Sequence, residues 1–203
     1  MKRFCLWCAA VLIPVLAACS FSLIPQTEFT EPKLFDLVTP APLVDLPFSV
    51  EVDAFSSECS GRFKMVFREK GNQIDVDEYN RWSMPPGSML TKYLAARFAA
   101  PPDNQGRHSK RAFLLDGSVL ACELNKATNQ VELMIRYVIT DPDDGTFKVM
   151  GNEDCLIPVK ESTPEAFAEG MNTAAAKFAD KIVDVLKDEL KKLSAEAKTS
   201  QQK

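Results

Sequence analysis

The sequence has few of the residues on which most enzyme and nucleotide sites depend. Its 203 residues include one histidine and eight glycines, and no segment has the spacing of a glycine-rich phosphate loop or of a GxSxG nucleophile elbow. After residue 18 no two cysteines are spaced as CxxC, which is typical of thioredoxin-like redox sites and zinc knuckles. The single histidine, His108, lies in a polar stretch typical of an exposed loop. We therefore expect no catalytic residues, no metal ion, no nucleotide and no non-covalent cofactor.

Long apolar runs are also scarce, and the one near the start is too short to span a bilayer. Two basic residues precede the apolar residues 4–15, and residues 16–19 read Leu-Ala-Ala-Cys, which resembles a bacterial lipobox at all four positions. Residues 1–18 are therefore predicted to be a lipoprotein signal peptide, cleaved before a lipid-carrying Cys19. Because Ser20 follows the cysteine where an inner-membrane lipoprotein commonly has aspartate, we expect the periplasmic face of the outer membrane in a Gram-negative bacterium.

Removal of that signal peptide leaves an acidic chain. The full sequence has 24 Lys and Arg against 28 Asp and Glu, so the loss of two basic residues leaves 22 against 28, a net charge near −6. Binding to nucleic acid needs a cationic surface, so this balance argues against nucleic acid as a partner.

Three cysteines remain after Cys19, namely Cys59, Cys122 and Cys155. In an oxidising compartment this odd number allows one disulfide and one free thiol. The spacing does not choose among the three pairings, and three reduced cysteines in the core are an equal alternative.

Turn residues divide the chain into strand-like and helix-like segments. Apolar alternation predicts a short edge strand at 34–38 and further strands at 48–52, 63–67, 73–76, 112–124, 131–140 and 146–150. Helical spacing predicts one helix capped by Ser88 and a long final helix with Thr163 as its N-cap and Pro164 as its first residue. In the long helix Phe178 lies on a continuous apolar stripe, which gives it a structural role.

These segments predict an α+β fold. We expect a two-layer sandwich in which an antiparallel or mixed sheet is covered on one face by two helices, in the order β-β-β-α-β-β-β-α. The expected organisation is a signal peptide at 1–18, a lipidated tether at 19–33, a single α+β domain at 34–194 and a disordered tail at 195–203.

The chain resembles the PqiC-like ABC-transport auxiliary lipoproteins in an ordered set of motifs. They are the lipobox, Leu34-Phe35-Asp36-Leu37, Met65-Val66-Phe67-Arg68, Asn80-Arg81-Trp82-Ser83-Met84-Pro85 leading into a helix, and the long helix from Thr163. The order matches along essentially the whole mature chain. Two features depart from the family pattern: Phe35 stands where the family often has tyrosine, and the three later cysteines lie outside it.

The resemblance implies a non-enzymatic role in lipid transport and membrane integrity. Family members accompany an ABC transporter whose periplasmic subunit is an Mce-domain protein, so the expected role is to dock that conduit at the outer membrane. A lipid-anchored regulator of a peptidoglycan enzyme and a periplasmic lipid-binding chaperone are the alternatives. We also expect self-association into a homo-oligomer.

The segment before the first helix holds the candidate partner-binding residues Asn80, Arg81 and Trp82. Adjacent side chains of an extended segment point to opposite faces, so Arg81 is the better contact if Trp82 lies in the core. Pro85 has a structural role there, because it ends the extended segment.

The lipobox leads to a prediction for Cys19. Replacement Cys19→Ala removes the lipid acceptor, so an unprocessed or mislocalised precursor is expected. Fractionation of cells labelled with palmitate measures this, and label retained on the alanine variant would exclude Cys19 as the acceptor.

Overall fold

The computed structural model describes residues 30–99, 111–142 and 147–200. Cys19, the predicted signal peptide and His108 lie outside these residues. Most of the described chain belongs to one compact unit, Pro32–Lys203. Within the described residues, no helix is both long and apolar enough to cross a membrane.

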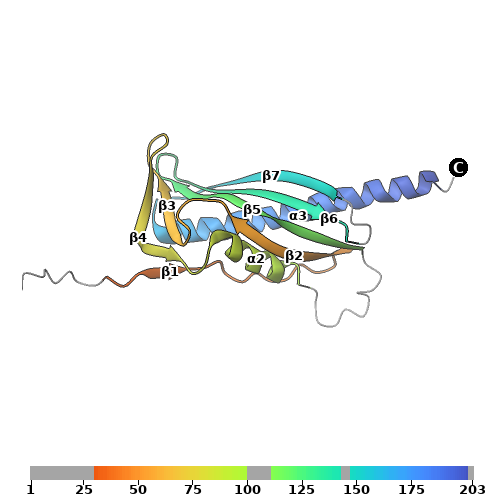
Figure 1. Ribbon diagram of the computed structural model, residues 1–203, viewed down its shortest axis with the longest axis horizontal. Helices are drawn as coiled ribbons and strands as arrows, with labels where there is room; N and C mark the ends of the chain where they lie inside the picture. The colour runs from red at the N-terminus through yellow and green to blue at the C-terminus, as the bar shows by residue number, and fades with distance from the viewer. Residues whose placement is uncertain (1–29, 100–110, 143–146, 201–203) are drawn as a thin grey trace, which may run out of the picture. The chain divides into compact units, whose positions relative to one another are not determined.

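The described part of this unit is built from one mixed sheet and two helices (Figure 1). The elements are β1 (Lys33–Phe35), β2 (Phe48–Ser57), β3 (Lys64–Arg68), β4 (Ile74–Trp82), α2 (Pro86–Arg97), β5 (Arg111–Asn125), β6 (Gln130–Thr140), β7 (Phe147–Pro158) and α3 (Pro164–Ser200). The strand order is β1-β4-β3-β5-β6-β7, and β2 also pairs with β5. The predicted fold class is confirmed: all four strand-like segments expected before the first helix form strands, including the short edge strand that the order β-β-β-α-β-β-β-α leaves out.

The long strand β5 organises the sheet. On one side it pairs antiparallel with β6. On the other side it pairs in parallel with β2, from Phe48–Arg111 to Ser57–Val119, and then with β3 at Phe67–Leu124. Two strands therefore follow one another along the same edge of β5, joined by the loop of residues 58–63.

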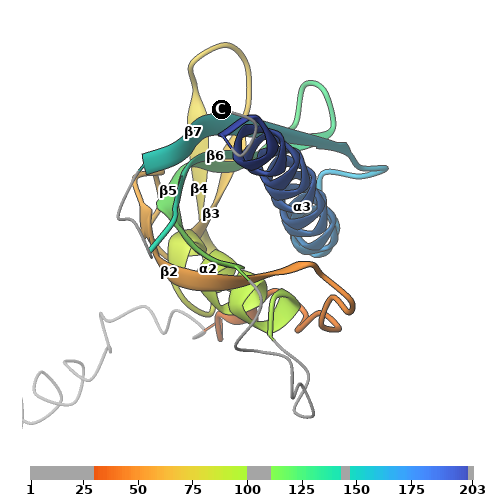
Figure 2. The same cartoon turned by 90° about the vertical axis from the view of Figure 1, so that its right-hand side faces the viewer.

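The sheet curls around α3, with β7 on one side of the helix and β2 with α2 on the other (Figure 2). Apolar residues of β5, β6 and both helices form one buried cluster. Two phenylalanines of α3 anchor it through edge-to-face ring contacts, which are favourable beyond their buried area. Phe167 contacts Phe67 and Trp82 at centroid distances of 5.7 and 5.1 Å, and Phe178 contacts Phe55 and Tyr137 at 6.2 and 5.7 Å.

The prediction that Ser88 caps the first helix is wrong, because the helix starts at Pro86 with Pro85 as its N-cap and Ser88 lies in its first turn. Proline is favoured at the first helical position, and the carbonyl of Pro85 accepts a hydrogen bond from the N–H of Met89 at 3.0 Å. Gly87 lies against β2, where a Cβ atom would come within 2.4 Å of the Phe55 carbonyl oxygen. The Gly87 N–H donates to Ser57 Oγ at 2.8 Å, so the start of α2 is fixed on β2.

The last helix begins where the sequence predicts. Thr163 Oγ1 accepts the N–H of Ala166 at 3.2 Å, as an N-cap does. The last fully buried side chain on the helix is Leu186. The helix continues to Ser200, beyond residue 194 where the domain was expected to end, because its Lys, Glu, Ala and Leu residues favour helix.

The packing of α3 leads to a prediction for stability. Phe178 is 0 % exposed. Replacement Phe178→Ala is expected to cost about 3–5 kcal/mol, close to the whole stability of a small domain, and to abolish most folding. Deletion of residues 195–203 is expected to change the melting temperature little. Circular dichroism melting curves of the two variants provide the measurement, and a large loss on the deletion would mean that this end of α3 packs against another subunit.

Candidate functional site

The predicted partner-binding segment lies in a large bulge of β4. Lys64 of β3 pairs with Arg81, and Val66 pairs with Val76. Residues 77–80 of β4 therefore stand opposite Met65 alone. A bulge of this kind re-aims side chains and is common at sheet edges and functional sites. β1 pairs with β4 only from Asn80 to Trp82, so the bulge begins where the outer edge of β4 has no pairing partner among the described strands.

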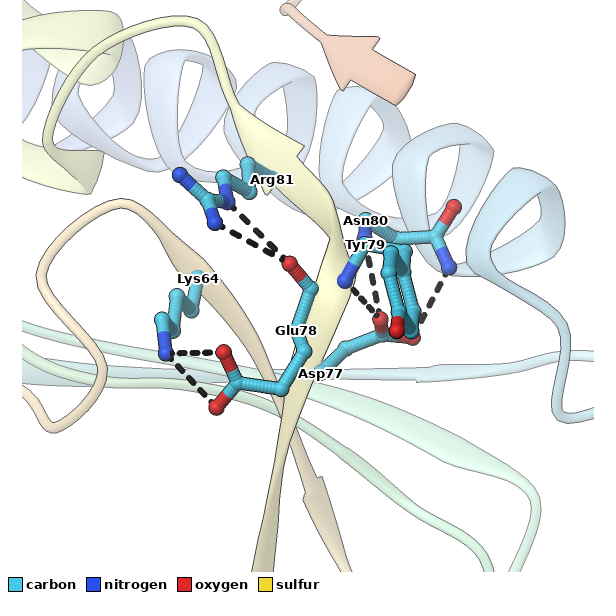
Figure 3. Close-up of polar contacts among 6 residues, drawn as sticks. All are labelled: Lys64, Asp77, Glu78, Tyr79, Asn80 and Arg81. Atoms are coloured by element: carbon cyan, nitrogen blue, oxygen red, sulfur yellow. Dashed lines mark hydrogen bonds and ion pairs between the residues drawn. The ribbon is translucent and has the colours of Figure 1, made fainter. Parts of the chain in front are cut away.

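The carboxylate of Asp77 holds the bulge in shape (Figure 3). Its Oδ1 accepts the backbone N–H groups of Tyr79 and Asn80 at 2.8 and 2.9 Å, and its Oδ2 accepts the side-chain amide of Asn80 at 2.8 Å. Partial burial acts to raise the pKa of Asp77, but the hydrogen bonds from Asn80 and Tyr79 outweigh it and hold the pKa below its ordinary value of 3.8. The bulge is thus stabilised by the ionised carboxylate.

On the other side of the bulge, two cations converge on Glu78 (Figure 3). Lys64 Nζ lies 2.7 Å from both carboxylate oxygens of Glu78. Arg81 donates from Nε and Nη2 to the Glu78 backbone carbonyl at 3.3 and 3.1 Å. The Arg81 guanidinium therefore lies along the surface of its own strand, with donors left over for another acceptor.

Exposed apolar side chains surround these charges. Tyr79 is 54 % exposed, Phe63 44 % and Leu34 69 %. Leu34 is the register partner of Arg81, and the Phe63 carbonyl accepts the N–H of Trp82 at 2.6 Å, so both residues lie at the bulge. We call Leu34, Phe63, Tyr79 and Arg81 the bulge surface, in which Arg81 lies on the Glu78 side of β4 and Tyr79 on the Asp77 side (Figure 3).

Of the three residues selected from the sequence, only Arg81 belongs to this surface. Asn80 and Arg81 are both half-buried, but the Asn80 amide is engaged by Asp77. Trp82 is 1 % exposed and packs against Phe167, so it is a core residue in this conformation. Among residues 30–99, 111–142 and 147–200 its indole N–H has no hydrogen-bond partner, contrary to the usual case for a buried tryptophan. The sequence did not select Phe63 or Leu34 as contacts, because apolar alternation placed them in the predicted strands 63–67 and 34–38.

Within the described ranges, no group of three His, Cys, Asp or Glu side chains is arranged to hold a metal ion. The acidic residues of β4 do not converge on a pocket. Asp75 is exposed, Asp77 binds backbone N–H groups and Glu78 pairs with Lys64. These contacts fit a solvated, charged edge that discourages further strand pairing.

The sequence profile of one family matches residues 60–183, more than half of the chain, and its description is ABC-type transport auxiliary lipoprotein component. The chain belongs to this family. The resemblance inferred from the ordered motifs is confirmed, and the matched region includes the β4 bulge. No curated protein matches this auxiliary lipoprotein in sequence.

Two solved structures share the fold. Protein XCC0632 from Xanthomonas campestris has a TM-score of 0.62 and 13% identity, and the alignment covers 80% of this chain and 99% of that one. A second crystal structure, of an uncharacterized protein, has a TM-score of 0.60 and 11% identity, with 77% of this chain and 99% of that chain covered. At these identities the likeness shows the fold alone.

The Asp77 contacts lead to a prediction for pH dependence. Replacement Asp77→Ala removes three hydrogen bonds to an ionised acceptor and should destabilise the domain by about 1–3 kcal/mol at pH 7. A carboxyl whose folded-state pKa is lowered stabilises the fold above its unfolded pKa and loses that effect as the pH falls through the folded pKa. The difference in unfolding free energy between wild type and variant should therefore shrink below about pH 3.8.

Urea unfolding at pH 7 and at stepwise lower pH measures this difference. Asp75→Ala is the matched control on the same strand, because its carboxylate has only a 3.8 Å ion pair with Lys126 and is 60% exposed. That change should stay within about 0.5 kcal/mol at every pH. A difference for Asp77→Ala that does not vary with pH would contradict the role of the ionised carboxylate.

Proposed function

We propose that this auxiliary lipoprotein is non-enzymatic and docks the periplasmic conduit of an ABC/Mce-type lipid transport system at the outer membrane. Family membership supports association with an ABC-type transport system. The Mce-domain subunit, the outer membrane and the lipid cargo are parts of the proposal. Cys19 supplies the lipid anchor.

The bulge surface is the observation that carries the proposal. Arginine and tyrosine are enriched among the residues that dominate binding energy at protein interfaces, where apolar contacts surround them. Here Arg81 and Tyr79 lie on the two sides of the bulge, with Leu34 in register with Arg81, on a backbone that Asp77 holds fixed. A preformed surface loses little conformational entropy when a partner binds, which favours docking.

The packing under the sheet favours docking over lipid carriage. A carrier needs an apolar cavity large enough for acyl chains. In this domain the rings of Phe55, Phe67, Phe167 and Phe178 occupy the space between α3 and the sheet in direct contact with one another or with neighbouring rings. These contacts favour a function that acts through the outer surface of the protein, as docking does, over carriage of lipid in its interior.

The length of the expected tether favours the adaptor over a regulator of peptidoglycan synthesis. If flexible, residues 20–33 would keep the domain within about 20 Å of its membrane on average. A conduit that ends at the outer membrane lies within this distance, whereas the peptidoglycan layer lies farther away.

The test is a pull-down with the periplasmic Mce-domain subunit of the same bacterium. Replacement Arg81→Glu reverses a charge at the bulge surface without touching the core, so the variant should fold normally and lose capture of the subunit, because like charges at an interface repel. Tyr79→Ala should weaken capture as well. Lys181→Glu is the matched control, because Lys181 is an exposed cation on α3 and lies outside the bulge surface.

Capture that survives both Arg81→Glu and Tyr79→Ala would overturn the assignment of the bulge surface. A wild-type protein that ignores the Mce-domain subunit at high concentration would overturn the adaptor role and favour the cell-wall regulator. Binding of radiolabelled phospholipid by the wild-type protein in proportion to its concentration would instead favour the lipid chaperone.

A further inference from the structure

The loop between β2 and β3 brings one cysteine close to another. Since both strands pair with the same edge of β5, the loop of residues 58–63 runs beside that strand. The N–H of Glu58 still donates to the Val119 carbonyl at 2.9 Å, which extends the pairing past the end of β2. The next residue is Cys59, whose partly buried side chain packs against the hydrophobic core.

The register places Cys122 next to this position. Ser57–Val119 is the last registered pair of β2 and β5. Cys59 follows Ser57 by two residues and Cys122 follows Val119 by three, and β5 has an irregularity between Val119 and Ala121 that takes up the extra residue. Along the direction of β5, Cys59 on the loop therefore lies beside Cys122 on the strand.

Both side chains also lie on the same face of the sheet. Cys122 points into the core, where its Sγ lies 3.7 Å from Sδ of Met171. Cys59 packs against that same core. Burial raises the pKa of the Cys122 thiol, and the nearby Cys59 is the next largest cause of the rise. The Cys59 side chain is thus close enough to act on the ionisation of the Cys122 thiol.

The third cysteine lies too far away to replace either of them. Cys122 is in register with Leu133 on β6, and Leu133 with Cys155 on β7. Two strand spacings separate the Cα atoms of Cys122 and Cys155 by about 10 Å, whereas a disulfide needs Cα atoms within about 7 Å.

We propose that Cys59 and Cys122 form a disulfide in the exported protein and that Cys155 remains a free thiol. The bridge fastens the 58–63 loop to β5. This modification is independent of the proposed docking role, and it resolves the three pairings that the spacing of the cysteines leaves open.

The oxidant is the disulfide of an oxidising thiol:disulfide oxidoreductase. Cys59 is the more accessible thiol and lies at a surface pocket with Arg62 and Phe63, so it reacts first. Its thiolate attacks one carrier sulfur, forms a mixed disulfide and releases the other carrier sulfur as a thiolate. The Cys122 thiolate then attacks Sγ of Cys59 and expels the second carrier sulfur. Two cysteine thiols are oxidised, and the carrier disulfide is reduced to two thiols.

The loop that would be fastened borders the bulge surface. It turns sharply at Gly61 and Arg62, where φ is +86° and +52°, and the N–H of Lys64 donates to the Gly61 carbonyl at 2.8 Å. It ends at Phe63, whose carbonyl accepts the Trp82 N–H. The bridge therefore restrains the loop that carries Phe63 relative to β5.

Trypsin makes the bridge easy to map, because it places each cysteine in its own peptide: Cys59 in residues 34–62, Cys122 in 112–126 and Cys155 in 149–160. The full chain is expressed in a Gram-negative host with its own residues 1–18. The processed, membrane-bound form is alkylated with iodoacetamide during lysis and digested without reductant. Mass spectrometry should find peptide 34–62 joined to 112–126, and dithiothreitol should separate them.

Variants make the assignment specific. Cys155→Ser should keep the cross-linked pair, whereas Cys59→Ser should leave peptide 112–126 unlinked. Recovery of 34–62 and 112–126 as separately alkylated peptides from the wild-type protein would overturn the proposal. A cross-link of either peptide to 149–160 would overturn it as well.

Discussion

The contact between the apolar stripe of α3 and the curled sheet is the interaction on which the rest of the structure depends. Its buried residues recur at helical spacing from Phe167 to Leu186, and their burial supplies most of the stability of such a domain. Phe167 touches rings from β3 and β4, and Phe178 touches rings from β2 and β6. One helix thereby holds together strands that are distant in sequence.

The bulge of β4 is supported from beneath by that same contact. Trp82 packs on Phe167 inside the domain, one residue away from Arg81 on the surface. The shape of the bulge itself comes from short hydrogen bonds to Asp77. The Lys64–Glu78 ion pair beside it is exposed and contributes at most about 1 kcal/mol. Salt would therefore screen the charges offered to a partner while leaving the backbone that presents them unchanged.

Local patterns predicted the fold class because it follows from periodicity, and an ordered set of motifs predicted the family. Alternating apolar residues marked the strands, and the stripe with Thr163 and Pro164 at its start marked α3. The sheet order could not be predicted, because nothing in the local pattern of β2 or β3 says that both pair with one edge of β5. Trp82 and Arg81 were separated by simple alternation, whereas the extra residues 77–80 interrupt that alternation and hide the exposure of Tyr79 and Phe63.

The burial of Trp82 makes the domain its own optical probe. The sequence has two tryptophans, and Trp7 lies in the predicted signal peptide. In the processed protein all indole emission would then come from one ring, enclosed against Phe167 and covalently next to the surface that Arg81 occupies. The wavelength of this emission would report whether α3 packs on the sheet. The intensity of the emission would respond to a partner bound at the bulge surface, without any added label.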